Sequence, residues 1–145
     1  MKMSEKGIKF LIQEEGERLK AYKCAAGVWT IGVGHTGQDV KEGMVVTKEK
    51  SRELLKLDLS RFEKAVNTCI KLQLEQHKFD ALVSLAFNIG VGNFSKSTLV
   101  KKINVNAAIE EIEFQFKEWR KAGGKPILLP RRERESKLYK GGIYE

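Results

Sequence analysis

Three side chains with chemically useful groups occur close together near the start of the sequence: the carboxyl group of Glu15, the thiol of Cys24 and the hydroxyl of Thr30. Glu15 continues the helical register of Ile8 and Leu11, so it falls on the apolar stripe of an amphipathic helix. Desolvation there would raise the pKa of its carboxyl group, which could then hold and donate a proton. The same three residues also fit ordinary roles as a solvated acid, a small buried side chain and a strand former.

These residues come from a helix end and from the sheet that we expect after it. Gly16 is typical of a helix end, and residues 18–36 form short alternating segments separated by glycines, which predicts a small antiparallel sheet. Within it, Trp29 and Ile31 share one face, while Thr30 lies on the other. We expect a third strand over residues 40–46.

A long helix is predicted over residues 48–67, with Thr47 as its N-cap. At about 1.5 Å per residue it would be roughly 30 Å long and could connect two lobes. From residue 75 onward the apolar residues return to helical spacing, and a last basic helix begins near Pro130.

The predicted fold class is therefore α+β. We expect one domain, residues 1–145, in which a small antiparallel β lobe (approximately residues 13–60) is joined by the long helix to a mainly helical lobe (residues 1–12 and 61–145).

The chain is basic, with 27 lysine and arginine residues, 19 aspartate and glutamate residues and a formal net charge of +8. This charge favours a polyanionic partner, such as nucleic acid, acidic lipid or bacterial cell wall. The two cysteines and two histidines lack the spacing of a zinc site, so we expect neither a metal nor another cofactor. No apolar run is long enough for a membrane span or a signal peptide, so we expect a cytosolic product without stable membrane insertion.

The run EGERLKAYKCAAGVWTIGVGHTG resembles the active-site segment of the phage lysozymes, the endolysins of glycoside hydrolase family 24 that include the T-even and lambdoid phage enzymes. The family pattern is Glu-Gly, then Arg-Leu-x-x-Tyr-x-(Asp or Cys), then Gly-x-x-Thr-Ile-Gly-x-Gly-His, and the sequence meets it from Glu15 to His35. The segments FDALVSLAFNIGVGNFSKSTL, FKEWRKAGGK and LPRRERESKLY are similar to later parts of the same family. The likeness thus extends over residues 8–139.

The resemblance implies a lysozyme-like fold with the active-site cleft between the lobes. It implies hydrolysis of the β-1,4 bond between N-acetylmuramic acid and N-acetylglucosamine in peptidoglycan, for lysis of a bacterial host. Glu15 would be the general acid, Cys24 would occupy the Asp-or-Cys position and Thr30 would help to position the attacking water. Substrate-binding residues are implied at Ser84, Phe87 and Asn88. Supporting residues are implied at His35, Arg131 and Arg132, with one of the two arginines paired with the catalytic acid.

Further implications concern partners and location. The resemblance implies peptidoglycan as the partner, a monomeric enzyme encoded by a phage or prophage, and residence in the host cytoplasm until a holin gives access to the wall.

Cys24 departs from the commoner aspartate. An aspartate near pKa 3.9 is ionised while a glutamic acid of raised pKa is still protonated, whereas a thiol near 8.5 reverses that order. Either the site lowers the pKa of Cys24, for example through the cationic neighbours Arg18, Lys20 and Lys23, or Cys24 acts without ionising first. Activation of water, direct attack on the anomeric carbon and a packing role all stay open.

Two other functions are kept beside the enzyme. A lysozyme homologue that binds peptidoglycan without cutting it is compatible with the cysteine at position 24. A basic helical nucleic-acid-binding protein is supported by the net charge and by the RRER run at residues 131–134, although no recognition motif accompanies it.

Overall fold

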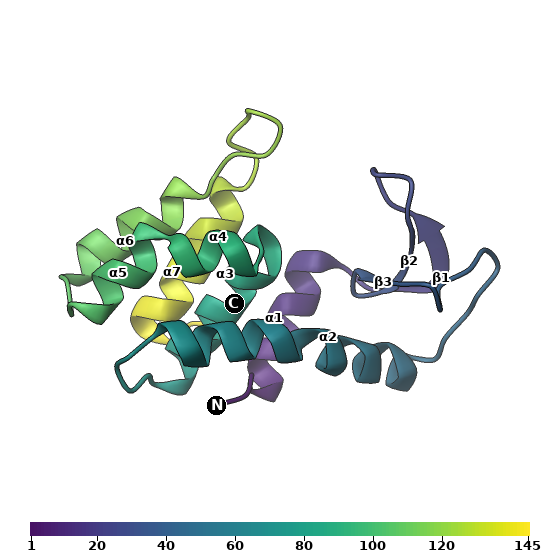
Figure 1. Ribbon diagram of the computed structural model, residues 1–145, viewed down its shortest axis with the longest axis horizontal. Helices are drawn as coiled ribbons and strands as arrows, with labels where there is room; N and C mark the ends of the chain where they lie inside the picture. Colours follow the sequence, from purple (N-terminus) through teal and green to yellow (C-terminus); the bar gives the residue numbers. More distant parts are fainter. The chain divides into compact units, whose positions relative to one another are not determined.

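The computed structural model describes residues 1–145, and its helices and strands appear in Figure 1. The elements in chain order are α1 (Glu5–Glu15), β1 (Arg18–Lys23), β2 (Trp29–Gly32), β3 (His35–Thr36), α2 (Lys48–Cys69), α3 (Gln76–Ile89), α4 (Val91–Lys96), α5 (Thr98–Asn104), α6 (Ile109–Glu118) and α7 (Leu129–Gly141).

The chain divides into two compact units. One, the sheet unit, is Leu11–Ser60; the other, the helical unit, comprises Met1–Phe10 and Arg61–Glu145. Helices α1 and α2 each contribute residues to both units. The predicted β lobe begins at residue 13, whereas the sheet unit begins at Leu11, and both end at residue 60.

The sheet has the order β1-β2-β3, and both strand pairs are antiparallel. Thr30 in the central strand is paired with Tyr22 on one side and Thr36 on the other. The predicted small antiparallel sheet over residues 18–36 is therefore confirmed.

The prediction of a third strand over residues 40–46 is wrong. The third strand is instead the two-residue β3, which follows a tight turn with Gly34 at a φ of 71°. Residues 40–46 form a connection that is held to β1, because Val46 donates its amide to the carbonyl of Leu19 at 2.8 Å and Ala21 donates to Met44 at 2.9 Å. Val40 and Val46 are apolar because both ends of this connection are buried.

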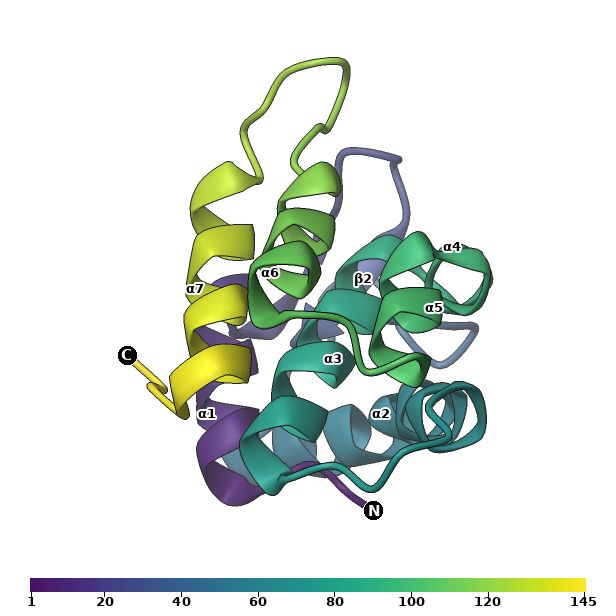
Figure 2. The same ribbon diagram turned by 90° about the vertical axis from the view of Figure 1, so that its left-hand side faces the viewer.

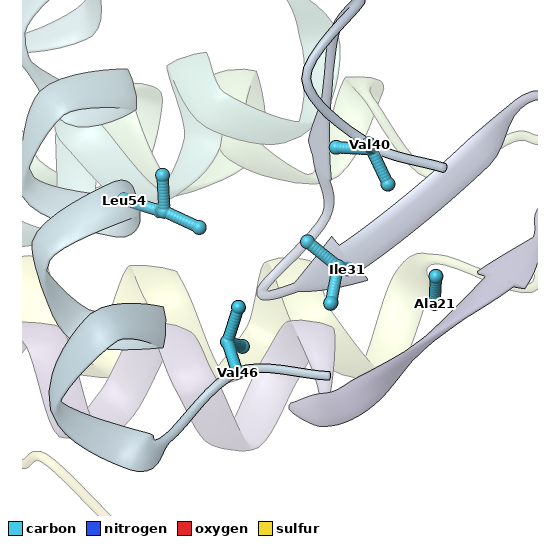
Figure 3. Close-up of a cluster of buried hydrophobic side chains, with 5 residues drawn as sticks. All are labelled: Ala21, Ile31, Val40, Val46 and Leu54. Atoms are coloured by element: carbon cyan, nitrogen blue, oxygen red, sulfur yellow. The ribbon is translucent and has the colours of Figure 1, made fainter. Parts of the chain in front are cut away.

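Those buried ends belong to the core of the sheet unit. Figure 3 shows how the side chains of this core converge from β1, β2, the connection and helix α2: Ala21, Ile31, Val40, Val46 and Leu54. Burying these side chains fixes the first half of α2 against the sheet.

The ends of α1 and α2 follow the sequence signals. Gly16, with a φ of 80°, ends α1, and its amide donates to the carbonyl of Ile12 at 2.7 Å. Thr47 caps α2, since its hydroxyl oxygen accepts a hydrogen bond from the amide of Lys50 at 3.1 Å. Both signals therefore predicted the correct helix boundary.

The helical unit is built around α3. Helix α3 packs against α7, which also packs against α6, and Figure 2 shows these three helices side by side. Phe79, Phe94, Phe116 and Leu138 have no exposed surface. None of the helices combines the length and the apolar character that a membrane crossing requires. The predicted all-helical second half is confirmed, including the last helix that begins beside Pro130.

His35 attaches the shortest strand to α2. Its Nδ1 lies 2.8 Å from a carboxylate oxygen of Asp58 on α2, and its Nε2 lies 3.0 Å from Asp39. Burial alone would lower the pKa of His35, but hydrogen bonds and charge from Asp58 and then Asp39 outweigh it, so the pKa is raised above 6.5. These contacts give His35 a supporting structural role.

We expect His35→Gln to destabilise the protein in a pH-dependent way. Because the folded-state pKa is raised, the stabilisation from the protonated ring is fully present below about pH 6.5 and is lost as the pH rises through the folded-state pKa. Urea unfolding should show a parent-minus-variant difference of about 1–2 kcal/mol at low pH that shrinks as the pH rises. A difference that is the same at every pH would mean that His35 contributes packing alone.

Candidate active site

Cys24 is the first residue of the short loop that joins β1 to β2. The loop closes on itself, because the amide of Cys24 donates to the carbonyl of Val28 at 3.0 Å and the amide of Gly27 donates to the carbonyl of Cys24 at 2.8 Å. Gly27 adopts a φ of 78°, which other residues rarely adopt. The Cys24 side chain is partly exposed, so solvent can reach the sulfur.

The surroundings of Cys24 lower the pKa of its thiol. The main causes are hydrogen bonds from the backbone of Val28 and Ala26, followed by the side chain of Thr30. These bonds favour the thiolate, because each places a partial positive charge against the sulfur. The structure thus supports a lowered pKa, the first of the two alternatives that the sequence left open.

The cause differs from the predicted one. The sequence suggested cationic neighbours as one possible cause of a lowered Cys24 pKa, but Arg18 stacks on the ring of Tyr22 at 4.5 Å and Lys23 lies over Trp29 at 5.4 Å. The loop backbone and a hydroxyl group provide the effect instead.

Thr30 lies next to this loop on β2 and is 3% exposed. Its hydroxyl is 2.9 Å from the carbonyl oxygen of Val28, to which it donates. A hydroxyl has one proton and can rotate, so the same group can turn its proton toward the sulfur when Cys24 ionises. The pKa of Cys24 thus depends in part on the Thr30 hydroxyl.

Glu15 is the last residue of α1, and it belongs to the same unit as Cys24 and Thr30. The apolar register is present, since Ile8 and Leu11 are buried, but the Glu15 side chain is only partly buried. The carboxyl group thus lies where the apolar stripe of α1 ends at Gly16.

A second carboxylate, close to Glu15, was missed in the sequence. Glu17 Oε2 accepts hydrogen bonds from Ser51 Oγ at 2.7 Å and from Arg52 Nε at 3.1 Å. Burial acts to raise the pKa of Glu17, but the hydrogen bonds from Arg52 and Ser51 outweigh it, so the pKa is lowered. No periodic spacing links these residues, which is why sequence patterns could not identify the cluster.

Three further predicted residues lie on α3 in the helical unit. Ser84 has no exposed surface, and its hydroxyl donates to Glu135 at 2.5 Å. The Ser84 side chain thus belongs to the interior of the helical unit, and its role in substrate binding stays a prediction. Phe87 stacks against Phe62, with ring centroids 5.1 Å apart. Asn88 differs from both, since its side-chain oxygen Oδ1 is buried without a hydrogen-bond partner.

The two arginines implied as partners of the catalytic acid both contact a buried glutamate. Arg131 Nε is 3.1 Å from Glu135 Oε2, and Arg132 Nε is 2.7 Å from Glu135 Oε1. Burial raises the pKa of Glu135, while the positive charges of Arg132 and Arg131 oppose that shift. Arg131 also donates to the backbone carbonyl of Ser84 at 3.1 Å.

This burial weakens the nucleic-acid-binding alternative. Arg131 is 7% exposed and Arg132 is fully buried, so two of the three arginines in the RRER run belong to the core of the helical unit. A surface that binds phosphates needs exposed cations.

Comparison with known proteins agrees with these features. Residues 12–135 match the family model described as phage lysozyme. The endolysin of Salmonella phage P22 is 47% identical over 144 residues, which cover 96% of this chain and 98% of that protein.

Two solved structures are also similar. An endolysin from the Escherichia coli O157:H7 phage FAHEc1 superposes with a TM-score of 0.92 at 34% identity, covering 100% of this chain and 97% of that one. The muramidase domain of SpmX from Asticaccaulis excentricus superposes with a TM-score of 0.86 at 34% identity, covering 96% and 97%.

The effect of Thr30 on the Cys24 thiol can be tested by alkylation. In a chain with Cys69→Ser, the rate of reaction of Cys24 with iodoacetamide should rise with a midpoint pH below 9.0. Thr30→Val should raise that midpoint, since the thiolate loses a hydrogen-bond donor, and Thr36→Val on the exposed β3 strand is the matched control. An equal midpoint pH in the Thr30 and Thr36 variants would contradict an effect of Thr30 on the Cys24 thiol.

Proposed function

Because the chain belongs to the phage lysozyme family, we propose that it is a muramidase that hydrolyses the β-1,4 bond between N-acetylmuramic acid and N-acetylglucosamine in bacterial peptidoglycan. One observation carries this proposal: Glu15, Cys24 and Thr30 belong to one compact unit, in which hydrogen bonds from the loop backbone and from Thr30 lower the pKa of the Cys24 thiol. An acid and a group able to activate water are the two requirements of glycosidic hydrolysis.

In this proposal Glu15 is the general acid. It transfers its proton to the glycosidic oxygen while the bond to the leaving sugar breaks, which avoids expelling an alkoxide. The position of Glu15 at the end of α1, in the same unit as Cys24 and Thr30, supports the role.

Cys24 and Thr30 activate the water. The Cys24 thiolate accepts a proton from a water molecule that attacks the anomeric carbon, and the Thr30 hydroxyl orients that water. A thiol of pKa 8.5 is ionised in about 3% of molecules at pH 7, and each unit by which the pKa falls increases this fraction up to about tenfold. Lowering the pKa of Cys24 therefore acts directly on the fraction of competent enzyme.

The helical unit supplies substrate-binding groups. The buried Oδ1 atom of Asn88 has no partner within the protein, so it can accept a hydrogen bond from the N–H of a sugar N-acetyl group. Phe87, next to it on α3 and held by Phe62, offers an apolar face to the same sugar.

The distribution of charge fits an anionic wall polymer. The helical unit contains 19 lysine and arginine residues against 11 aspartate and glutamate residues, whereas the sheet unit contains eight of each. The formal net charge of +8 therefore belongs to the helical unit, whose lysine and arginine residues would attract the wall. We also propose that the protein acts as a monomer and that it leaves the host cytoplasm through a membrane lesion made by a holin.

Glu15→Gln tests the central assignment. Loss of the proton donor should reduce the release of soluble muropeptides from purified peptidoglycan by about 100-fold to 10,000-fold. Glu14→Gln removes the same charge from the preceding residue of α1 and should retain most of the activity. Release by the Glu15 variant at more than about a tenth of the parent rate would show that another residue is the acid.

Substitutions of Cys24 separate its possible roles. If the thiolate is the base, Cys24→Asp should remain active and shift the acidic limb of the pH–rate profile downward, because an aspartate ionises near pH 4. Cys24→Ser should be nearly inactive, since a hydroxyl does not ionise in this range. A fully active serine variant with an unchanged profile would reduce Cys24 to a packing residue. A parent that binds peptidoglycan without releasing muropeptides would favour the non-catalytic alternative.

A further inference from the structure

Glu17 is bound on both sides of its carboxylate by residues of α2. Ser51 Oγ donates to Oε2 at 2.7 Å, Arg52 Nε donates to the same oxygen at 3.1 Å and Arg52 Nη2 reaches Oε1 at 3.5 Å. The Glu17 side chain is 12% exposed and the Arg52 side chain is 38% exposed, so the carboxylate is the more buried partner of this pair. Only Gly16 separates Glu17 from Glu15 along the chain.

The same serine hydroxyl touches the end of the strand that carries Thr30. A β-carbon added to Gly32 would lie 2.9 Å from Ser51 Oγ, so the serine fills the space where a side chain would stand. Gly32 is two residues beyond Thr30 and adopts a φ of 66°, which also disfavours other residues. Gly32 is paired with Arg18 on β1, directly after Glu17.

The buried hydroxyl of Ser51 thus contacts Glu17, two residues after Glu15, and lies against Gly32, two residues after Thr30. We propose that Glu17, held by Ser51 and Arg52, is a positioning residue that fixes the Glu15 carboxyl group relative to Thr30 for the reaction. The inference rests on the muramidase function proposed above and extends it to residues outside the acid, thiol and hydroxyl.

The chemistry of the cluster suits this role. Hydrogen bonds from Arg52 and Ser51 outweigh the effect of burial and lower the pKa of Glu17, so its carboxylate stays charged to a lower pH than an ordinary glutamate. Hydrogen bonds between an ionised acceptor and two donors are stronger and better oriented than neutral ones. Gly16 has a freely adjustable backbone, so without an anchor at Glu17 the end of α1 could change its direction relative to the sheet.

The expected effect is on the chemical step. A misplacement of about 1 Å in a catalytic group can cost about 100-fold in rate, even when the mutation lies away from the reacting atoms. Loosening the anchor at Glu17 should therefore lower kcat and leave KM nearly unchanged, because Glu17 does not bind substrate.

The test compares Glu17→Ala, Glu17→Gln, Ser51→Ala and the double variant Glu17→Ala/Ser51→Ala on purified peptidoglycan. We expect Glu17→Ala and Ser51→Ala each to lower kcat by about tenfold with KM changed by less than about twofold. Glu17→Gln retains a hydrogen-bond acceptor for Ser51 and should keep more activity than Glu17→Ala. The double variant should be no slower than the slower single variant, because both changes remove one shared interaction.

Glu53→Ala is the matched control. Glu53 is on α2 beside Arg52, its side chain is 70% exposed and its contact is a surface pair with Lys50 at 3.9 Å. Its replacement removes the same charge as Glu17→Ala and should leave kcat unchanged. Melting temperatures of all variants are measured, and rates are taken well below the lowest of them, so that unfolding does not enter kcat.

The outcomes distinguish the two proposals. An active parent whose Glu17 and Ser51 variants melt earlier but retain kcat would show that the cluster only stabilises the fold. Equal losses in the Glu53 control, or losses at Glu17 and Ser51 that multiply in the double variant, would also overturn the inference. A parent that releases no muropeptides would overturn the muramidase function itself and the positioning role with it.

Discussion

The sheet unit depends on the first half of α2, because Leu54 of this helix completes the core that the short strands begin. Leu54 provides an apolar surface against Ile31, and a short distance along the same helix Ser51, Arg52 and Asp58 provide polar partners. The two kinds of contact are mutually dependent: the apolar packing excludes water from the polar groups, and the paired polar groups allow the packing to form without leaving a buried charge unsatisfied.

The helical unit also contains buried polar groups, and these are paired with one another. Glu135 is fully buried, and it is accompanied by two arginines and the hydroxyl of Ser84. Removing one partner of such a buried group is far more costly than its net contribution to stability, since the remaining charges lose their compensation. Sequence likeness identified Arg131, Arg132 and Ser84 as important positions. Arg131 and Glu135 link α7 to Ser84 on α3, and Arg132 donates to the carbonyl of Trp119 after α6.

How far the sequence could predict the structure depends on the range of the interactions. Local signals worked: Gly16 predicted the end of α1, Thr47 capped α2 and glycine-separated alternation predicted the sheet. The prediction of a strand over residues 40–46 failed, because Val40 and Val46 are apolar residues at the two buried ends of a loop. The role of Ser84 and the existence of the Glu17 cluster depended on partners far along the chain, for which a single sequence contains no periodic signal.

The hairpin between β1 and β2 shows how a thiol can stand where an acid is commoner. The hydrogen bonds that lower the pKa of Cys24 come first from the backbone of Val28 and Ala26 within the same short loop. Such dipoles are fixed by the loop geometry, so they need no charged side chain and are weakened little by salt, whereas the effect of exposed lysines and arginines would be screened. A loop that turns its own backbone toward the sulfur can therefore favour a thiolate in a unit of zero net charge, which removes the need for the cationic neighbours that the sequence suggested.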